Sequence, residues 1–313
     1  MKSATARRAR ELGTLVGLVL LVGLLSFLTP HFLSVSNLLN VMEQTSINAV
    51  IALGMTFVIL SGGIDLSVGS LLALAGVVLA WALQAGWPVP AAILAGLAVG
   101  GTSGLVNGLL ITKGRLPAFI ATLGMMSIAR GAALVFTSGR PISGFRTAFR
   151  QLSTARILGV PAPIVITIAV YALGHFLLTR TRFGRYVYAI GGNEEATRLS
   201  GIDAGFHKTM VYVLSGVASG LAAALLTARL NSAQPIAGIN YELDAIAATV
   251  IGGTSLSGGV GTLHGTLIGA LIMGVLRNGL NLLGTSSFFQ QIVIGIVIIT
   301  AVLVDSMLKP SAK

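Results

Sequence analysis

The hydropathy pattern of the chain is a series of long apolar stretches separated by short polar connections. A helix needs about 20 apolar residues to cross the hydrocarbon core of a bilayer. Ten stretches approach this length, and one of them is short. The pattern therefore predicts an all-α, polytopic transmembrane protein with about ten spans. The predicted spans are 12–29, 41–60, 66–84, 91–111, 117–137, 161–179, 208–230, 243–253 (the short one), 262–283 and 288–308.

The composition supports this class of protein and excludes others. Hydrophobic residues make up 54% of the chain and charged residues 9%, against roughly 25% charged residues in a typical soluble domain. The net charge of +11 does not indicate nucleic-acid binding, because most basic residues flank apolar stretches and do not alternate with aromatic residues. The four histidines lack a close metal-ligand spacing and there is no cysteine, so we predict no metal site and no cofactor.

The distribution of lysine and arginine predicts how the chain is oriented in the membrane. With a cytoplasmic N-terminus, thirteen of the 20 lysine and arginine residues fall on the cytoplasmic side, as the positive-inside rule requires. Four arginines fall on the outer side, in one loop within 139–160. The predicted organisation is a cytoplasmic tail at 1–11, a single transmembrane domain at 12–308 and a cytoplasmic tail at 309–313. Both termini are then cytoplasmic and the protein is multi-pass.

One connection, at about 180–207, is long, polar and basic, which is unusual between two spans. Its second half has the signals of a short helix over 194–200. Asn193 is a good N-cap, because its side-chain oxygen can accept a hydrogen bond from a free backbone N–H. Glu194 and Glu195 follow in the first turn, where negative charge suits the helix dipole.

The end of this short helix is equally well marked. Arg198 lies in the last turn, and Gly201 stands where a left-handed residue commonly ends a helix. Ala196, Leu199 and Ile202 give the helix a narrow apolar face. Because so short a helix is marginally stable alone in water, we expect it to dock on a partner. In a membrane transporter the natural partner is a soluble motor domain.

Two regularly spaced sets of glycines predict close contacts between helices. A glycine at every fourth position lines one face of a helix, so that a neighbouring backbone can approach closely. Tight packing is the favoured interpretation, and a sliding or rocking contact is the alternative. The glycines are Gly96, Gly100, Gly104 and Gly108 in one span, with Gly261, Gly265 and Gly269 repeating the spacing near the start of another.

An internal similarity suggests two related halves. The segments LSGGIDLSVGSLLAL (60–74) and TSLSGGVGTLHGTLIGAL (254–271) each join a glycine- and serine-rich break to an apolar helix. Internal repeats around a central pathway are common in transporters. The sequence leaves open whether these breaks lie at the membrane surface or within it.

Several polar residues fall in or near predicted spans. Asp65 follows two glycines at the start of a span, and we favour an N-cap at the membrane edge over a buried functional charge. Asn48, Asn107, Gln234 and Asn278 are candidates for hydrogen bonding to a substrate in a pathway, although hydrogen bonds between helices are the commoner use of such residues.

Charged residues inside apparent spans need partners. Arg130 and Arg277 should face protein, water or a carboxylate. Glu242 and Asp244 are plausible partners, but the sequence does not pair them.

The chain resembles the permease subunits of monosaccharide (ribose-type) ABC importers. The likeness covers about residues 30–306. The segments that carry it are NLLNVMEQTSINAVIALGMTFVILSGGIDLSVGSLLAL (37–74), KGRLPAFIATLGMMSIARG (113–131), GRYVYAIGGNEEATRLSGI (184–202), ARLNSAQPIAGINYELDAIAATVIGGTSLSGGVGTLHGTLIGALIMG (228–274) and RNGLNLLG (277–284).

The resemblance implies a permease that works as a homodimer with a second copy of itself in the cell inner (plasma) membrane. It also implies a cytoplasmic sugar-type ATPase subunit and an extracytoplasmic sugar-binding protein as partners. The family's ATPase-coupling loop corresponds to the connection at 180–207, which we call the coupling segment. Its candidate residues are Arg182, Gly184, Arg185, Gly192, Asn193, Glu194, Glu195, Ala196, Arg198, Leu199 and Gly201.

The sequence therefore predicts the membrane subunit of an ATP-driven monosaccharide importer that performs no covalent chemistry. A stand-alone secondary sugar transporter or channel is the alternative, and Asp65 is the clear candidate for its ion-coupling acid. A third class, an intramembrane hydrolase, would need a serine–histidine or paired-acid site, and no convincing one occurs in the sequence.

Overall fold

The computed structural model describes the backbone of residues 2–307 and the side chains of residues 13–303. Each predicted apolar stretch contains a helix, and together they make a polytopic helical membrane protein. The predicted tail at 309–313 lies outside the described residues. The helices are α1 (Lys2–Leu28), α2 (Val35–Leu60), α3 (Val68–Gln84), α4 (Val89–Thr112), α5 (Ala118–Thr137), α7 (Ala162–Arg180), α10 (Ala204–Leu230), α11 (Tyr241–Ile251), α12 (Leu263–Leu282) and α13 (Ser287–Met307).

The helices differ in their capacity to cross a bilayer. Among the described residues, six helices are long and apolar enough to cross by themselves: α2, α4, α5, α7, α10 and α12. Shorter apolar helices lie within α1, α3 and α13. Helix α11 has 11 residues and spans roughly 16 Å, about half of the hydrocarbon thickness.

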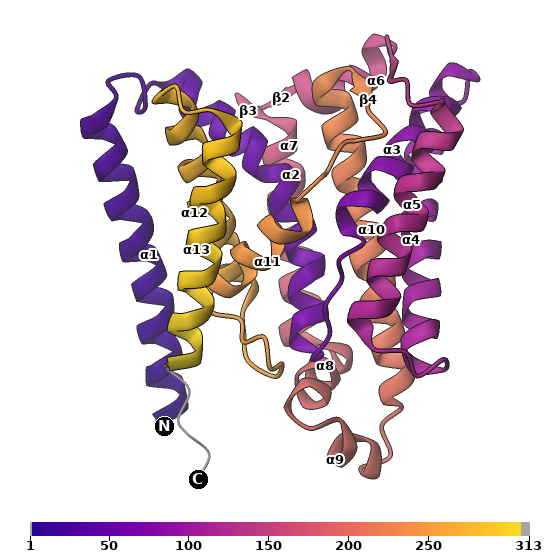
Figure 1. The fold of residues 1–313 in the computed structure, drawn as a ribbon, viewed down its shortest axis with the longest axis vertical. Coiled ribbons are helices and arrows are strands. Elements are labelled where there is room, and N and C mark those ends of the chain that lie inside the picture. Colours follow the sequence, from indigo (N-terminus) through magenta and orange to yellow (C-terminus); the bar gives the residue numbers. More distant parts are fainter. Residues whose placement is uncertain (1, 308–313) are drawn as a thin grey trace.

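The remaining elements gather at the two ends of the bundle (Figure 1). At one end lie α6 and the strand pairs, in which β1 pairs with β4 and β2 with β3, both antiparallel. At the other end lie α8 and α9, with the start of α1 and the end of α13 on the same side. These elements are α6 (Thr147–Thr154), α8 (Arg182–Gly192), α9 (Glu194–Leu199), β1 (Ile142–Ser143), β2 (Arg156–Ile157), β3 (Val160–Pro161) and β4 (Ser232–Ala233).

One prediction about these connections needs correction. The first half of the coupling segment is not a loop, because α8 occupies it with Val187 and Ile190 buried on one face. Helix α1 is continuous from Lys2, so the predicted tail at 1–11 belongs to the same helix as the first span, and its cytoplasmic location stays a prediction.

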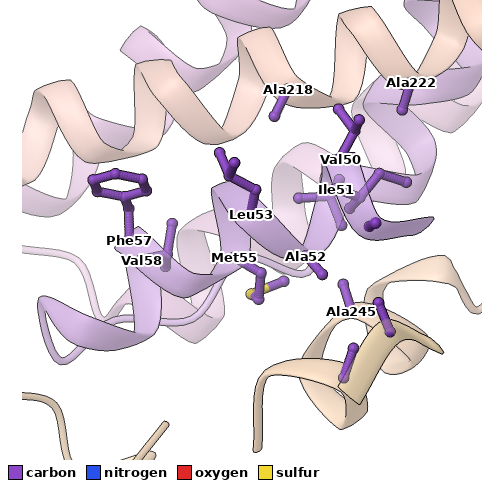
Figure 2. Close-up of a cluster of buried hydrophobic side chains, with 14 of the residues drawn as sticks. Val50, Ile51, Ala52, Leu53, Met55, Phe57, Val58, Ala218, Ala222 and Ala245 are labelled. Carbon is purple, nitrogen blue, oxygen red and sulfur yellow. The ribbon is translucent and has the colours of Figure 1, made fainter. Parts of the chain in front are cut away.

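Helix α2 forms the centre of the core. Nearly all of its residues from Ala49 to Leu60 are buried, as expected for a helix that is apolar all round. Figure 2 shows α2 side chains between Ala218 and Ala222 of α10 on one side and Ala245 of α11 on the other. These small partners allow the three helices to pack closely.

Three of the four predicted α4 glycines face α10, and the two backbones touch, whereas a Cβ at Gly96 would meet Ala75 and Leu79 of α3. A Cβ at Gly100 would overlap the carbonyl oxygen of Gly216, and a Cβ at Gly216 would overlap that of Gly100. Gly104 lies in the same way against Tyr212, and Gly108 against Thr209. No side chain larger than hydrogen fits at these positions without moving a helix.

The second glycine set is only partly as predicted. Gly265 and Gly269 of α12 lie against the backbones of Gly252 and Ala248 at the end of α11. Gly261 is not part of this face, because α12 begins at Leu263 and Gly261 instead lies against the side chain of Thr254.

The bundle contains two interruptions that approach each other. The chain leaves α2 at Leu60 and begins α3 at Val68, and it leaves α10 at Leu230 and begins α11 at Tyr241. A Cβ at Gly69 would overlap the carbonyl oxygen of Gly238, so the two segments are in backbone contact where α3 and α11 begin. The relation of the two halves of the chain as structural repeats stays a prediction.

The contact between α4 and α10 can be tested with one substitution and a matched control. We expect Gly104→Leu to lower folded protein in the membrane, because overpacking a tight contact costs about 1–3 kcal/mol or more. Gly124→Leu is the control, since nothing lies within 4 Å of a Cβ there. Membrane abundance and thermal stability in detergent measure the effect. Equal stability of the two variants would contradict the observed packing.

Candidate coupling and translocation sites

The short helix of the coupling segment has the caps that the sequence predicts. The side-chain oxygen of Asn193 accepts a hydrogen bond from the backbone N–H of Ala196 at 2.9 Å. Gly201 is left-handed, with φ of 80°. Arg198 pairs with Glu195 at 2.8 Å. The helix is shorter than predicted, because α9 ends at Leu199.

Helix α9 turns its apolar residues outward. The side chain of Leu199 is 79% exposed, and Ala196 is also exposed. The α9 residue that is buried against the rest of the chain is Thr197. Arg182 and Arg185 on α8 are exposed as well. The surface at this end of the bundle therefore combines a fixed helix, an uncovered leucine and basic side chains.

Contacts on the inner side hold α9 in place. Lys208 of α10 forms an ion pair with Glu194 at 2.9 Å. A cavity of about 350 Å³ separates α9 from the ends of α4 and α10. Its lining includes Arg115, Arg198 and Asp203. Helix α9 is therefore attached to the bundle by the ion pair of its first residue and by the buried Thr197, with the cavity beside Arg198.

The C-terminal end of α8 makes a backbone junction with two distant segments. A Cβ at Gly191 would overlap the carbonyl oxygen of Leu60, the last residue of α2. That carbonyl accepts a hydrogen bond from the N–H of Gly259 at 2.9 Å. The hydroxyl of Tyr188 donates to the carbonyl of Gly261 at 2.8 Å. We call the contact of Gly191, Leu60 and Gly259 the glycine junction.

Sequence reasoning missed Gly191 and named its neighbour Gly192. A Cβ at Gly192 meets nothing within 4 Å, whereas Gly191 is in contact with backbone from two other segments. Gly184, which was named, lies against the carbonyl of Leu178 at the end of α7. The Gly-Gly pair in the sequence was a signal for this junction, but it does not tell which glycine faces the bundle.

Asp65 is a buried anchor and not an N-cap at the membrane edge. Its side chain is fully buried, and α3 begins three residues later at Val68. One carboxylate oxygen accepts from the N–H of Ser67 at 3.0 Å and from its hydroxyl at 2.5 Å, and the other accepts from Ser215 at 2.8 Å. Ser215 lies roughly 16 Å along α10 from its first residue, so this interruption enters the bundle.

The Asp65 network includes one of the predicted pathway residues. The side-chain amide of Asn107 on α4 donates to Ser67 at 3.0 Å, and Asn107 is fully buried. This network joins α4 and α10 to the segment before α3, and it uses the carboxylate for structure. An ion-coupling role for Asp65 finds no support in these contacts.

The two partly buried arginines inside the bundle have different kinds of partner. Arg277 of α12 pairs with Asp244 of α11 at 2.8 and 2.6 Å to the two carboxylate oxygens. Arg130 of α5 donates to the carbonyls of Pro235 and Ala237, both at 2.7 Å. Arg130 therefore satisfies backbone acceptors in the interruption before α11, where helical partners are missing.

The other predicted pathway residues separate into three kinds. Asn278 forms a reciprocal amide pair with Asn37, at 2.9 and 3.0 Å, which joins α12 to α2. Gln234 is exposed in the connection before α11. Asn48 lines a cavity, which measures about 370 Å³ and lies between α2, α10, α11 and α12.

Comparison with known proteins identifies the family of the chain. The chain belongs to the family described as the branched-chain amino acid transport system / permease component, whose model matches residues 37–302. Within that family it is similar to named permeases from several bacteria.

Three relatives place the chain more closely. It is 52% identical to the ribose import permease protein RbsC of Escherichia coli (strain K12) over 95% of this chain and 94% of the relative. It is 52% identical to RbsC of Bacillus subtilis (strain 168), over 95% and 92%. It is 42% identical to the D-allose transport system permease protein AlsC of Escherichia coli (strain K12), over 95% and 91%.

Substitution of Asp65 tests whether it is an anchor. We expect Asp65→Leu to lower thermal stability strongly, because it leaves the N–H of Ser67 and two hydroxyls without their acceptor, at about 1–3 kcal/mol for each buried group. Asp65→Asn keeps one acceptor oxygen, so its thermal stability should lie between those of Asp65→Leu and the wild type. Melting of the purified variants in detergent measures the order. An Asp65→Leu variant as stable as the wild type would refute the anchor.

Proposed function

We propose that this chain is the membrane subunit of an ATP-driven importer that carries a monosaccharide, ribose or a similar sugar, across the cell inner membrane. The observation that carries the proposal is the coupling segment, in which α9 is held by caps and an ion pair while Leu199 stays uncovered. The choice of sugar is supported by the printed names of the similar permeases.

The partner of α9 is a cytoplasmic ATPase subunit. Leu199 and Ala196 offer it an apolar contact, and Arg182 and Arg185 surround that contact with positive charge. The chain performs no catalysis itself. ATP binding would move the ATPase, and α9 would carry that movement into the bundle through α8.

The glycine junction gives this movement a route. It places α8 in backbone contact with the end of α2 and with the connection between α11 and α12. A shift of α8 would therefore act on both segments at once. The core packing of α2 against α10 and α11 (Figure 2) would spread the shift to the helices around the pathway.

The opposite end of the bundle is where an extracytoplasmic sugar-binding protein would dock. It carries α6, the strand pairs and the basic side chains of the connection after α5. A second copy of this chain would complete the pathway, as in the homodimer that the resemblance implies. Both termini and α9 then lie in the cytoplasm, with ten spans between. The basic residues of this end are Arg140, Arg146, Arg150 and Arg156.

A secondary transporter would need a titrating acid that is free to change its partners. Asp65 is engaged by Ser67 and Ser215, and Asp244 is engaged by Arg277. These contacts favour an ATP-driven importer over a secondary transporter. The family's description also raises branched-chain amino acids as substrates, so uptake assays should compare ribose with leucine.

The coupling role can be tested with an exposed leucine at each end of the bundle. We expect Leu199→Asp to abolish co-purification with the ATPase and ATP-dependent ribose uptake while membrane abundance stays normal. Leu158→Asp is the control for ATPase co-purification, because Leu158 is 99% exposed at the opposite end, away from the proposed ATPase contact. Full ATPase binding and uptake by Leu199→Asp would refute the coupling assignment.

The orientation can be tested because the chain has no cysteine. Single cysteines are introduced at Ser200, beside α9, and at Thr154, in α6, both of which are exposed. An impermeant thiol reagent should label Thr154→Cys in cells with a permeabilised outer envelope, and Ser200→Cys only after the inner membrane is opened. The reverse pattern would overturn the proposed orientation.

A further inference from the structure

The cavity of about 370 Å³ between α2, α10, α11 and α12 has a lining that fits a small polar molecule. Its volume lies near the lower end of the roughly 300–1,000 Å³ range of small-molecule pockets. Polar groups and apolar side chains share its wall, and none of the lining residues is a carboxylate. The lining residues are Gln44, Ile47, Asn48, Leu226, Arg229, Leu230, Tyr241 and Arg277.

One polar atom of this wall has no partner in the protein. The side-chain oxygen of Asn48 is buried and makes no hydrogen bond. A buried polar atom without a partner carries a free-energy cost of about 1–3 kcal/mol. Neighbouring amides do not share this property, since Asn37 and Asn278 satisfy each other. Asn48 is therefore an acceptor that a ligand hydroxyl could satisfy.

The donors of the wall are held by contacts outside the cavity. Arg277 is fixed by both carboxylate oxygens of Asp244, and its side chain remains 28% exposed. Arg229 donates to the side-chain oxygen of Asn40 at 2.8 Å. These tethers orient the guanidinium groups, and the carboxylate of Asp244 offsets the charge of Arg277. The wall thus presents oriented hydrogen-bond groups, with the charge of Arg277 neutralised and that of Arg229 retained.

The position of the cavity suits a step in transport. Leu226, Arg229 and Leu230 belong to the last turns of α10, far from α8 and α9 along the bundle. Tyr241 is the first residue of the half-length helix α11. Discontinuous helices commonly form substrate sites inside transporters. The cavity therefore lies on the route of a substrate that arrives at the α6 end.

From these observations we infer that this cavity is a sugar subsite, in which Asn48 accepts a hydrogen bond from a hydroxyl of a neutral monosaccharide and Tyr241 and Leu226 contact its C–H face. The inference rests on the proposed function. A sugar supplies both the hydroxyl donors and the apolar ring face that the wall requires, whereas inorganic phosphate lacks the apolar face.

A cysteine in the wall can report occupancy. Gln44→Cys, which leaves Asn48 intact in the otherwise cysteine-free chain, is placed in lipid nanodiscs and treated with a small water-soluble methanethiosulfonate reagent. Ribose at about ten times its dissociation constant leaves roughly one site in ten free, so it should slow modification about tenfold. Thr154→Cys, exposed in α6, is the control and should react at the same rate with and without ribose.

Inorganic phosphate serves as the competing probe. Protection by ribose and not by phosphate supports the neutral-sugar subsite. Protection by phosphate alone, or modification of Gln44→Cys at a rate that ribose does not change, overturns it. If Gln44→Cys does not fold, Leu230→Cys on the same wall is tested against the same criteria.

Uptake by the assembled wild-type importer separates this inference from the proposed function. ATP-dependent ribose uptake by the wild type, combined with no protection at position 44, overturns the subsite alone. Absence of ATP-dependent ribose uptake by the wild type overturns the proposed function and the subsite with it. In the assembled importer, Asn48→Leu should lower ribose uptake at least about tenfold while the loaded binding protein still stimulates ATP hydrolysis.

Discussion

Backbone groups inside a membrane protein must find partners within the protein, because the hydrocarbon offers none. This constraint explains the buried charges of the bundle. Asp65 accepts a hydrogen bond from the backbone N–H of Ser67 in the segment before α3. Arg130 donates hydrogen bonds to backbone carbonyls in the segment before α11. At the α8 end, the N–H of Gly259 donates a hydrogen bond to the carbonyl oxygen of Leu60, the last residue of α2. The interruptions are stable because each has its own partner.

Close packing and coupling both depend on glycine, which has no side chain to keep two backbones apart. Glycine lets α4 touch α10, and glycine lets α8 touch both α2 and the connection before α12. The first contact makes a rigid pair of helices, and the second connects the exposed α9 to the core. An importer of the proposed kind needs both properties, since a movement of α9 must reach the pathway without being absorbed by loosely packed helices.

The sequence predicted features that depend on local pattern. Apolar length located the membrane helices, and the residue types at Asn193 and Gly201 located the ends of α9. Features that depend on distant partners were not predictable. Arg277 had two candidate acids, and only the fold selects Asp244. Asp65 resembled a cap because its true partner Ser215 is far along the chain, and α8 resembled a polar loop because its buried face is only a few residues wide.

The central claim is that the glycine junction transmits movement from the coupling segment to the bundle. Gly191→Ala inserts a methyl group against the carbonyl of Leu60, whereas Gly192→Ala next to it meets open space. The decisive measurement is ribose uptake per ATP hydrolysed by the assembled importer in vesicles. The account predicts that Gly191→Ala binds the ATPase and hydrolyses ATP but loses most uptake, while Gly192→Ala keeps it. Equal and normal uptake by the two variants would contradict the account.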